Sequence, residues 1–295
     1  MIPWDILDAV THSDDQPGRD SADDTSSRTY PGELQEAVLG WQWYHTMELA
    51  SGLVTPGWFD TRSVAPKLPI PLSLAGMRCL DVGTFDGFWA FEMERRGGTV
   101  LAIDVVDPAK GDWPIGSEQA VVADIAKRMK EGNGFEIARR ALGSKVERQL
   151  ISVYDLDPSN VGTFDFIYVG SLLLHLRDPV RAVERVRSVC TGNALFVDAV
   201  DLELSIRMPG RAIAELDGIG RPWWWRPSIR GLEQMVKVGG FDQTQATQRL
   251  LMPPGEGQPL ARLRPKLLLS PQGRIAAVTR LGGDPHAAIL ARPRI

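Results

Sequence analysis

The residues with the clearest chemical potential lie in the segment 80–89, which reads LDVGTFDGFW, and at Asp104. Gly83 interrupts an apolar run, and a helix-like run follows it. Glycine allows a ligand to lie close to the backbone, and free N–H groups at a helix start would face that ligand. Asp104 lies 21 residues after Gly83. This is close to the ~20-residue offset at which a carboxylate at the tip of the next strand accepts hydrogen bonds from ribose hydroxyls.

The ligand indicated by this pattern is not a dinucleotide. The dinucleotide fingerprint G-x-G-x-x-G would need glycines where Phe85 and Phe88 stand. The segment instead has an acid, then two glycines, at Asp81, Gly83 and Gly87. A carboxylate before the turn repels pyrophosphate but organises a loop that holds a ligand amine. S-adenosylmethionine carries an amine, a ribose and an adenine without a phosphate. The alternative is a strand-turn-helix unit that binds nothing.

Three elements must position these residues. Residues 78–82 are typical of a short buried strand, and residues 88–96 are typical of a helix that Gly97 and Gly98 end. Residues 99–103 predict the next strand, with Asp104 at its end. The order strand, turn, helix, strand predicts a parallel sheet covered by helices.

At these residues the sequence resembles class I S-adenosylmethionine-dependent methyltransferases. Within them it is similar to the branch whose enzymes methylate or carboxymethylate a hydroxyuridine at the tRNA wobble position. The resemblance covers roughly residues 40–245. It is carried by the segments 81–89, 154–158 and 174–179, by Asp104, and by the segments 43–46 and 55–60.

The resemblance and the predicted strand ends together indicate a set of cofactor contacts. These predicted contacts are Asp81, Gly83, Thr84, Phe85, Gly87, Asp104, Asp155, Leu156, Gly170 and Ser171. Asp155 follows the third predicted strand, 146–153, where a carboxylate would accept from the adenine amine and Leu156 would pack on the ring. The alternative role for Asp155 is a helix N-cap or turn residue.

A hydroxyl acceptor would need a general base, and histidine suits this role because its ordinary pKa of ~6.5 leaves it largely neutral near pH 7. His175 follows the fourth predicted strand, 164–169, and His45 lies in an aromatic cluster; both are candidates. His175 has the alternative of merely lining the site. The other histidines fall in a predicted arm and tail, at His12 and His286. Alternative bases are Asp198, Asp201 and Glu215.

No histidine and cysteine cluster has the spacing of a zinc site, so no metal is predicted. A divalent cation between Asp198 and Asp201 is a weaker alternative. The sequence also lacks a G-x-S-x-G elbow and a phosphate-binding P-loop, which argues against hydrolases of that class and P-loop ATPases.

Two aromatic clusters are candidates for the substrate wall. The first spans 41–45 and is either part of a core or a lid over the site; the second is the tryptophan run 223–225. Three adjacent tryptophans cannot all face one core, so at least one is expected to line a pocket. The alternative is plain packing. The predicted substrate residues are Tyr44, Trp58, Trp224 and Arg226.

The composition is that of a globular protein, with 295 residues, 43% hydrophobic and a formal net charge of −4. The pI of about 5.7 gives no basic footprint for a polyanion, although the C-terminal part is locally rich in arginine. Cys79 and Cys190 lie in apolar runs and predict core residues in a reducing compartment. No run reaches the ~18 apolar residues of a membrane span, and the start lacks a secretory pattern, so we expect a cytoplasmic protein without membrane contact.

We expect a Rossmann-like, doubly wound α/β fold with a seven-stranded, mainly parallel sheet. Residues 1–30 predict a flexible arm, 31–75 a helical N-terminal cap and 76–295 the methyltransferase domain. The last antiparallel strands are expected at 243–250 and 274–281.

The function expected from the sequence is S-adenosylmethionine-dependent methylation of a small molecule, with an oxygen as the acceptor atom. The first alternative is a tRNA wobble-uridine methyl or carboxymethyl transferase. The second is a binding module that holds S-adenosylmethionine without catalysis.

Overall fold

The computed structural model describes residues 32–105, 111–114, 133–218, 222–258 and 271–294. The predicted arm, residues 1–30, lies outside this part of the chain. The centre of the described structure is an eight-stranded mixed sheet. Seven strands follow the order β12-β14-β9-β8-β5-β6-β7, and the eighth, β13, pairs with β14. The strands are β5 (Arg78–Val82), β6 (Thr99–Asp104), β7 (Glu147–Leu150), β8 (Phe164–Gly170), β9 (Cys190–Ala199), β12 (Phe241–Gln243), β13 (Gln248–Met252) and β14 (Asp284–Pro293).

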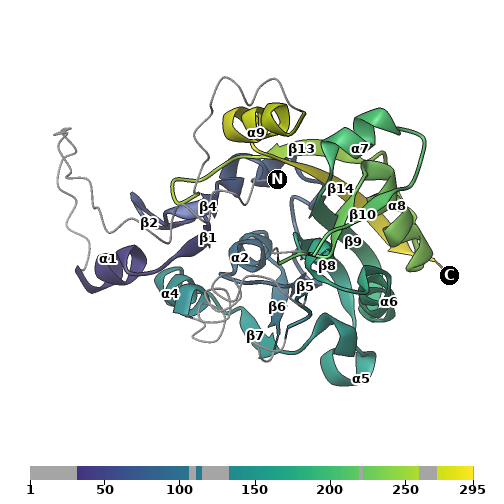
Figure 1. Cartoon of the computed structure of the whole chain (residues 1–295). Helices are drawn as coiled ribbons and strands as arrows, with labels where there is room; N and C mark the ends of the chain where they lie inside the picture. Colours follow the sequence, from purple (N-terminus) through teal and green to yellow (C-terminus); the bar gives the residue numbers. More distant parts are fainter. Residues whose placement is uncertain (1–31, 106–110, 115–132, 219–221, 259–270, 295) are drawn as a thin grey trace.

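Five strands of this sheet, β5 to β9, run parallel, whereas β14 pairs antiparallel with β9, β12 and β13. The longer helices cover both faces (Figure 1). Their bounds are α2 (Phe88–Arg95), α4 (Asn133–Ala141), α6 (Pro179–Val189), α8 (Ile229–Val238) and α9 (Pro271–Gly282). The shorter helices are α5 (Pro158–Val161) and α7 (Leu202–Arg207).

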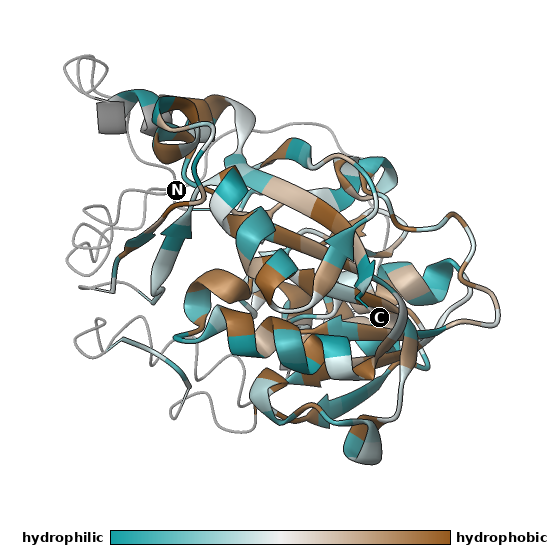
Figure 2. Ribbon diagram, turned by 90° about the vertical axis from the view of Figure 1, so that its right-hand side faces the viewer, coloured by the Kyte–Doolittle hydropathy of each residue, from teal (hydrophilic) through white to brown (hydrophobic). Residues whose placement is uncertain are grey.

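The two faces of the sheet follow from the alternation of side chains along each strand. In β8, Phe166 and Tyr168 pack with α2 and α4, while Ile167 and Val169 pack with α6 and α8. All four side chains are buried, as expected for a strand that helices cover on both sides. Figure 2 shows hydrophobic residues gathered in these central strands and in the helices against them. The expected doubly wound α/β arrangement is therefore present, with eight strands in place of seven.

The helical cap expected over 31–75 is not confirmed. This segment contains a single α-helix, α1 (Gly32–Leu39), followed by β1 (Trp43–His45), β2 (Glu48–Ala50), β3 (Leu53–Val54) and β4 (Gly57–Phe59). Two 3-10 helices, η2 (Thr61–Ser63) and η3 (Ala65–Lys67), complete it. Trp43 is fully buried and joins the same core cluster as α2, so the segment packs on the sheet domain. The proposed boundary at residue 75 stays a prediction.

The predicted strand 274–281 is wrong, because these residues belong to α9. A short apolar run does not distinguish a strand from a helix by its pattern. The last strand is β14, which the sequence analysis treated as a tail. The predicted strand 243–250 is divided between β12 and β13. A separate hairpin joins β10 (Ala214–Leu216) and β11 (Trp225–Pro227). No helix among the described residues has the length and hydrophobicity needed to cross a membrane.

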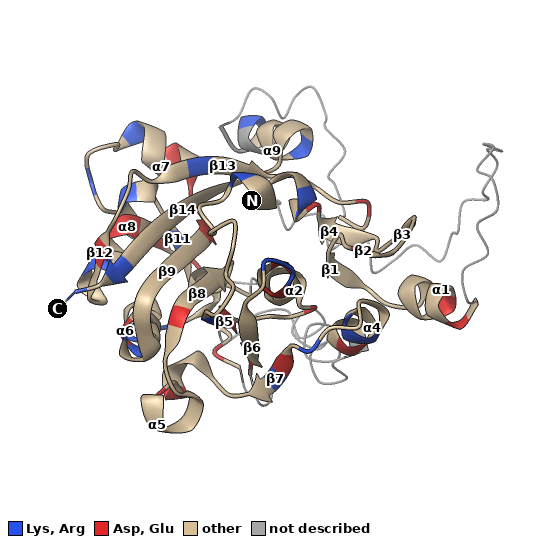
Figure 3. Ribbon diagram, turned by 180° about the vertical axis from the view of Figure 1, so that it is seen from behind, with Lys and Arg blue, Asp and Glu red and all other residues tan. Residues whose placement is uncertain are grey.

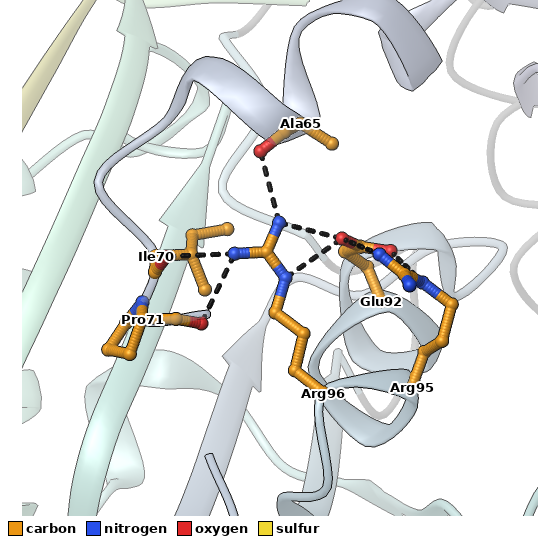
Figure 4. Close-up of polar contacts among 6 residues, drawn as sticks. All are labelled: Ala65, Ile70, Pro71, Glu92, Arg95 and Arg96. Carbon is orange, nitrogen blue, oxygen red and sulfur yellow. Dashed lines mark hydrogen bonds and ion pairs between the residues drawn. The ribbon is translucent and has the colours of Figure 1, made fainter. Parts of the chain in front are cut away.

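The Arg96 side chain joins the end of α2 to the N-terminal segment (Figure 4). The Arg96 side chain is 7% exposed and donates to Glu92 Oε1 at 2.7 Å. It also donates to the carbonyl oxygens of Ala65, Ile70 and Pro71 at 2.8–3.3 Å. Arg95 pairs with the same carboxylate but is 71% exposed. Two neighbouring arginines thus share one partner in different environments.

We expect Arg96→Ala to lower the free energy of unfolding by roughly 3 kcal/mol, because it leaves three carbonyl groups without their donor and removes the less exposed of the two arginines that pair with Glu92. Arg95→Ala is the matched control and should change stability by less than about 0.5 kcal/mol, because its ion pair is exposed. Urea denaturation of both variants measures the difference. Equal losses for the two variants would contradict a specific role for Arg96.

Candidate active site

The turn after β5 is held open by backbone conformation and by hydrogen bonds to β6. Gly83 and Gly87 have φ of 76° and 93°, in the region that favours glycine. Phe85 has φ of 52°, which is uncommon for a bulky residue. The N–H groups of Gly83 and Thr84 both donate to Ile103 O at 3.0 Å, and this pairing fixes the bend against the neighbouring strand.

Asp104, at the end of β6, supports the same turn from the side. Its Oδ2 accepts from the Phe85 N–H at 3.2 Å and from Arg148 at 3.2 Å, and its Oδ1 accepts from the Val105 N–H at 2.9 Å. Burial raises its pKa, although Arg148 and the backbone donors oppose that shift. Asp104 is thus buried beside the turn, at the place that the sequence spacing predicts.

Two further carboxylates lie beneath the turn. Asp81 accepts from Thr84 Oγ1 at 2.7 Å, and burial raises the pKa of Asp81 to about 7. Asp86 accepts from the N–H groups of Tyr44 and His45 at 2.9 and 2.8 Å and also bonds His45 Nδ1. Asp86 therefore ties β1 across the turn and brings Tyr44 and His45 to the same opening.

A cavity of about 860 Å³ opens at the carboxyl ends of β5, β6 and β8. This is the edge of a parallel sheet where ligands bind in such folds. Of the predicted site residues, eleven line the cavity. They are Tyr44, His45, Trp58, Asp81, Gly83, Phe85, Asp104, Asp155, Gly170, Ser171 and His175.

Asp155 lies in the 3-10 helix η5 (Val153–Asp155) at the rim of the cavity and is exposed. The alternative role as an N-cap goes to a neighbour, because the Asp157 side chain caps α5. Tyr154 beside it donates from its hydroxyl to Asp112 Oδ2 at 2.7 Å. The Asp155 side chain is therefore exposed at the rim and does not cap α5.

Five predicted site residues do not line the cavity. Leu156 is fully buried in the core against α6, and Thr84 turns inward to Asp81. A Cβ on Gly87 would meet the Phe91 ring at 2.5 Å, so this glycine serves packing. The remaining two are Trp224 and Arg226.

Trp224 and Arg226 lie behind the cavity wall. The Trp224 indole N–H donates to the carbonyl oxygen of Asp112, and Arg177 stacks on its ring at 4.7 Å. Arg226 pairs with Asp201 and, at 3.4 Å, with Glu215. Within the run 223–225, the tryptophan that lines the cavity is Trp223. A run of three identical side chains gives no signal that separates these positions, because only the backbone direction decides which one faces inward.

Two of the alternative bases, Asp198 and Asp201, accept hydrogen bonds that stabilise the fold. Asp198 Oδ2 accepts from the N–H groups of Leu172 and Leu173 at 3.1 and 2.7 Å, and burial raises its pKa to about 7. Asp201 caps α7 through Leu204 N. Within the described residues, no group of three or more His, Cys, Asp or Glu side chains is arranged to hold a metal ion. A cation between Asp198 and Asp201 is therefore not supported.

Three histidines line the cavity: His45, His175 and His286. His175 lies in η6 (Leu173–His175), bonds Pro222 O through Nδ1 at 2.5 Å, and has its pKa lowered by burial. The sequence predicts a tail at His286, whereas the structure has this residue in β14. The apolar run after Pro285 was the available signal for this strand.

The comparisons with known proteins concern the fold. No protein-family model matches the chain, and no curated protein is similar to it in sequence. The structure of EvdMO1 matches with a TM-score of 0.50 and 15% identity, over 89% of this chain and 48% of that chain. The chain thus spans about half the length of EvdMO1.

Two methyltransferase structures match at lower TM-scores. The 1,6-didemethyltoxoflavin-N1-methyltransferase of Burkholderia thailandensis, solved with S-adenosylhomocysteine, matches at 0.48 and 15% identity, over 80% of this chain and 78% of that chain. An S-adenosylmethionine-dependent methyltransferase from Mesorhizobium loti matches at 0.44 and 16% identity, over 79% and 97%. The chain therefore shares an α/β fold with EvdMO1, built on a central mixed sheet.

We expect the buried Asp81 to make the protein less stable as pH rises from about 4 to 7. In this window the folded carboxyl, with a pKa of about 7, keeps its proton, while an unfolded aspartate of pKa ~3.9 has lost it. The folded state then binds more protons, so the free energy of unfolding falls with rising pH. Asp81→Asn should remove roughly 2 to 4 kcal/mol of that fall.

Urea denaturation at pH 5 and pH 8 measures this change. The control is Asp242→Asn, because Asp242 forms a half-exposed ion pair with Arg294 and should leave the pH dependence unaltered. An unchanged pH dependence in Asp81→Asn would show that the proton resides on another group.

Proposed function

We propose that the protein is an S-adenosylmethionine-dependent methyltransferase that acts on an oxygen atom of a small molecule. The observation that carries the proposal is the cavity at the ends of β5 and β6, where the open turn at Gly83 and Phe85 faces the buried Asp104. This arrangement is the one expected for an adenosyl ligand whose ribose hydroxyls meet a carboxylate.

The residues present suit this cofactor. Asp104 Oδ1 has one backbone donor, which leaves a lone pair for a ribose hydroxyl. Asp155 at the rim would accept from the adenine amine. Asp81 lines the cavity under the turn and would face the ligand's ammonium group, whose charge favours the ionised carboxylate. Binding of the cofactor would therefore release a proton from Asp81 near neutral pH.

The charges around the cavity favour a cationic donor and a neutral acceptor. Five aspartates line it: Asp81, Asp104, Asp112, Asp155 and Asp284. Among the described lining residues the one arginine is Arg177, and it pairs with Asp112 at 3.5 Å. A polyanionic acceptor would meet an excess of negative charge here. Basic and acidic residues are also interspersed over the side of the protein seen in Figure 3.

The size of the cavity suits two ligands at once. Small-molecule sites are generally about 300–1,000 Å³, and this one, at about 860 Å³, is near the upper end. When bound, S-adenosylmethionine supplies an activated methyl group on its sulfonium. The chain's own part is to hold the acceptor in line with that methyl group and to exclude water. The aromatic lining, which includes Trp58, Phe59 and Trp223, favours an acceptor with an apolar body.

The runner-up function is a tRNA wobble-uridine methyl or carboxymethyl transferase, which the sequence resemblance favours. An RNA enzyme should lose affinity steeply as salt rises, because counterions are released on binding. A non-catalytic module is a second alternative, and tight cofactor binding without turnover on any acceptor would favour it. A cytoplasmic location remains part of the proposal.

We expect Asp104→Asn to weaken S-adenosylmethionine binding about 10- to 100-fold, because a charged hydrogen bond contributes roughly 1.5 to 3 kcal/mol. Calorimetry with S-adenosylmethionine and S-adenosylhomocysteine measures the affinity. The matched control is Asp165→Asn, since Asp165 lies at the start of β8, at the opposite edge of the sheet, and accepts from Arg78 N. If the wild-type protein binds neither compound, or if both variants bind equally well, the proposed site is wrong.

A further inference from the structure

The cavity extends well beyond the part assigned to the cofactor. Because β14 runs antiparallel to β9, the start of β14 lies at the same edge as the ends of the parallel strands, and His286 pairs with Ala199. Four strand spacings, roughly 19 Å, separate β14 from β6. His286 lines this far end, near the start of β14, and the proposed cofactor contacts leave it unused. Ser171 follows β8, midway between β14 and β6 in the sheet.

Hydrogen bonds fix the tautomer of His286. Its Nδ1 lies 2.9 Å from Asp284 O, and a carbonyl oxygen only accepts, so Nδ1 carries the hydrogen. Its Nε2 lies 3.2 Å from Ser171 Oγ and, in the neutral ring, presents a lone pair to that hydroxyl. Burial lowers the pKa of His286, which keeps the ring neutral near pH 7. Ser171 therefore donates to His286.

Ser171 is shared with Tyr44. Tyr44 lines the same cavity, and its side chain interacts with that of Ser171. Burial raises the pKa of Tyr44 far above the ordinary value, so Tyr44 stays protonated and can donate. A serine oxygen has two lone pairs. With Tyr44 donating to one of them, the second remains for another donor from the cavity. Ser171 has φ of 47°, an uncommon conformation for a non-glycine residue, and its N–H donates to Val197 O at 2.8 Å.

We infer that the acceptor of the proposed methyl transfer is a neutral hydroxyl compound that binds at Ser171 and Tyr44, and that His286 receives the hydroxyl proton through Ser171. This inference rests on the proposed function. The Phe59 ring lies 5.1 Å from that of Tyr44 and 6.5 Å from that of His286, measured between centroids. This aromatic wall suits an acceptor whose hydroxyl is attached to an apolar or aromatic body.

The step balances as follows. A lone pair of the acceptor oxygen forms the new O–CH₃ bond while the S–CH₃ bond breaks, and its electron pair stays on sulfur. The acceptor's O–H proton moves to Ser171 Oγ, and the Ser171 proton moves to His286 Nε2. The products are the methyl ether, S-adenosylhomocysteine and an imidazolium ring. Ser171 touches the acceptor, and His286 acts through it as a positioning residue and proton acceptor.

A serine next to a histidine also suggests a covalent nucleophile, but the surroundings favour the relay. Acyl transfer needs backbone N–H groups aimed at the developing oxyanion. The N–H groups of Ser171, Leu172 and Leu173 are already bonded to Val197 O and Asp198. The Phe85 N–H, across the cavity, donates to Asp104. These N–H groups already have acceptors and cannot stabilise an oxyanion. The surroundings of Ser171 therefore favour proton transfer over acyl transfer.

Several titratable groups act on this relay. Asp284 precedes His286 on β14, Asp198 contributes from β9, and Tyr44 contributes from β1. Asp86 acts on Tyr44 from the turn after β5. Because these carboxylates add to the pH dependence, the test compares variants with the wild-type protein at each pH.

The first experiment needs no turnover. In protein labelled with ¹⁵N-histidine, His286 should show a protonated Nδ1 and an unprotonated Nε2, and Ser171→Ala should shift its Nε2 resonance. Phenol, added with S-adenosylhomocysteine, should shift the same resonance in the wild type and not in Ser171→Ala. Ser188→Ala is the control, since Ser188 is an exposed residue that bonds Arg185 O on α6. A protonated Nε2, or an Nε2 chemical shift that is the same in Ser171→Ala and in the wild type, would overturn the relay.

The second experiment measures methyl transfer to hydroxylated aromatic compounds. We expect His286→Gln and Ser171→Ala to lower kcat about 10²- to 10⁴-fold, the usual contribution of a general base. The affinity of His286→Gln for S-adenosylmethionine should stay within threefold of the wild type. The wild-type rate should level off above the pKa of His286, whereas the rate of His286→Gln should keep rising to pH 9 as the acceptor itself ionises.

The outcomes separate the two proposals. If the wild-type protein does not bind S-adenosylmethionine, the proposed function is refuted. The ¹⁵N spectrum then still shows whether Ser171 donates to His286. Wild-type kinetics in His286→Gln, or a pH dependence that disappears in His175→Gln instead, overturns the relay and keeps the methyltransferase. Covalent labelling of Ser171 by a fluorophosphonate would make it a nucleophile and would overturn the relay as well.

Discussion

The buried carboxylate of Asp86 is the interaction on which the cavity depends. It is 2% exposed and accepts from two backbone N–H groups of β1 and from the His45 ring. A buried carboxylate is costly unless donors surround it, and here the donors come from a segment some forty residues earlier. The N-terminal segment is thereby fixed across the turn after β5. Tyr44 and His45 face the opening for this reason.

Backbone strain is concentrated at the same place. Among the described residues, positive φ outside glycine occurs at Phe85 and Ser171. Both follow strands of the parallel sheet, and both line the cavity. Such conformations cost about 1–3 kcal/mol each and persist only when the surroundings determine them. Asp104 supplies that constraint for Phe85, and Val197 supplies it for Ser171. Both strained residues therefore lie at the cavity.

The sequence predicted well the elements whose signals are local. Its β5-turn-α2-β6 unit, with Asp104 at the end, is present as expected. It failed where one pattern permits two structures. The short run 274–281 does not distinguish a helix from a strand by its pattern, and in the structure it belongs to α9, which packs against β13 and β14. The same limit applies to Trp223 and Trp224, whose identical side chains diverge because of backbone direction.

The sequence by itself determined the glycine turn and the acids around it, because these residues lie within one strand-helix-strand unit. Only the tertiary structure decided what stands opposite them. His286 contacts Ser171, which is 115 residues away in the chain. It lies near the start of β14, a strand that runs antiparallel to β9. Strand order and direction arise from packing between distant segments. The spacing of residues in the sequence therefore does not predict the contact between Ser171 and His286.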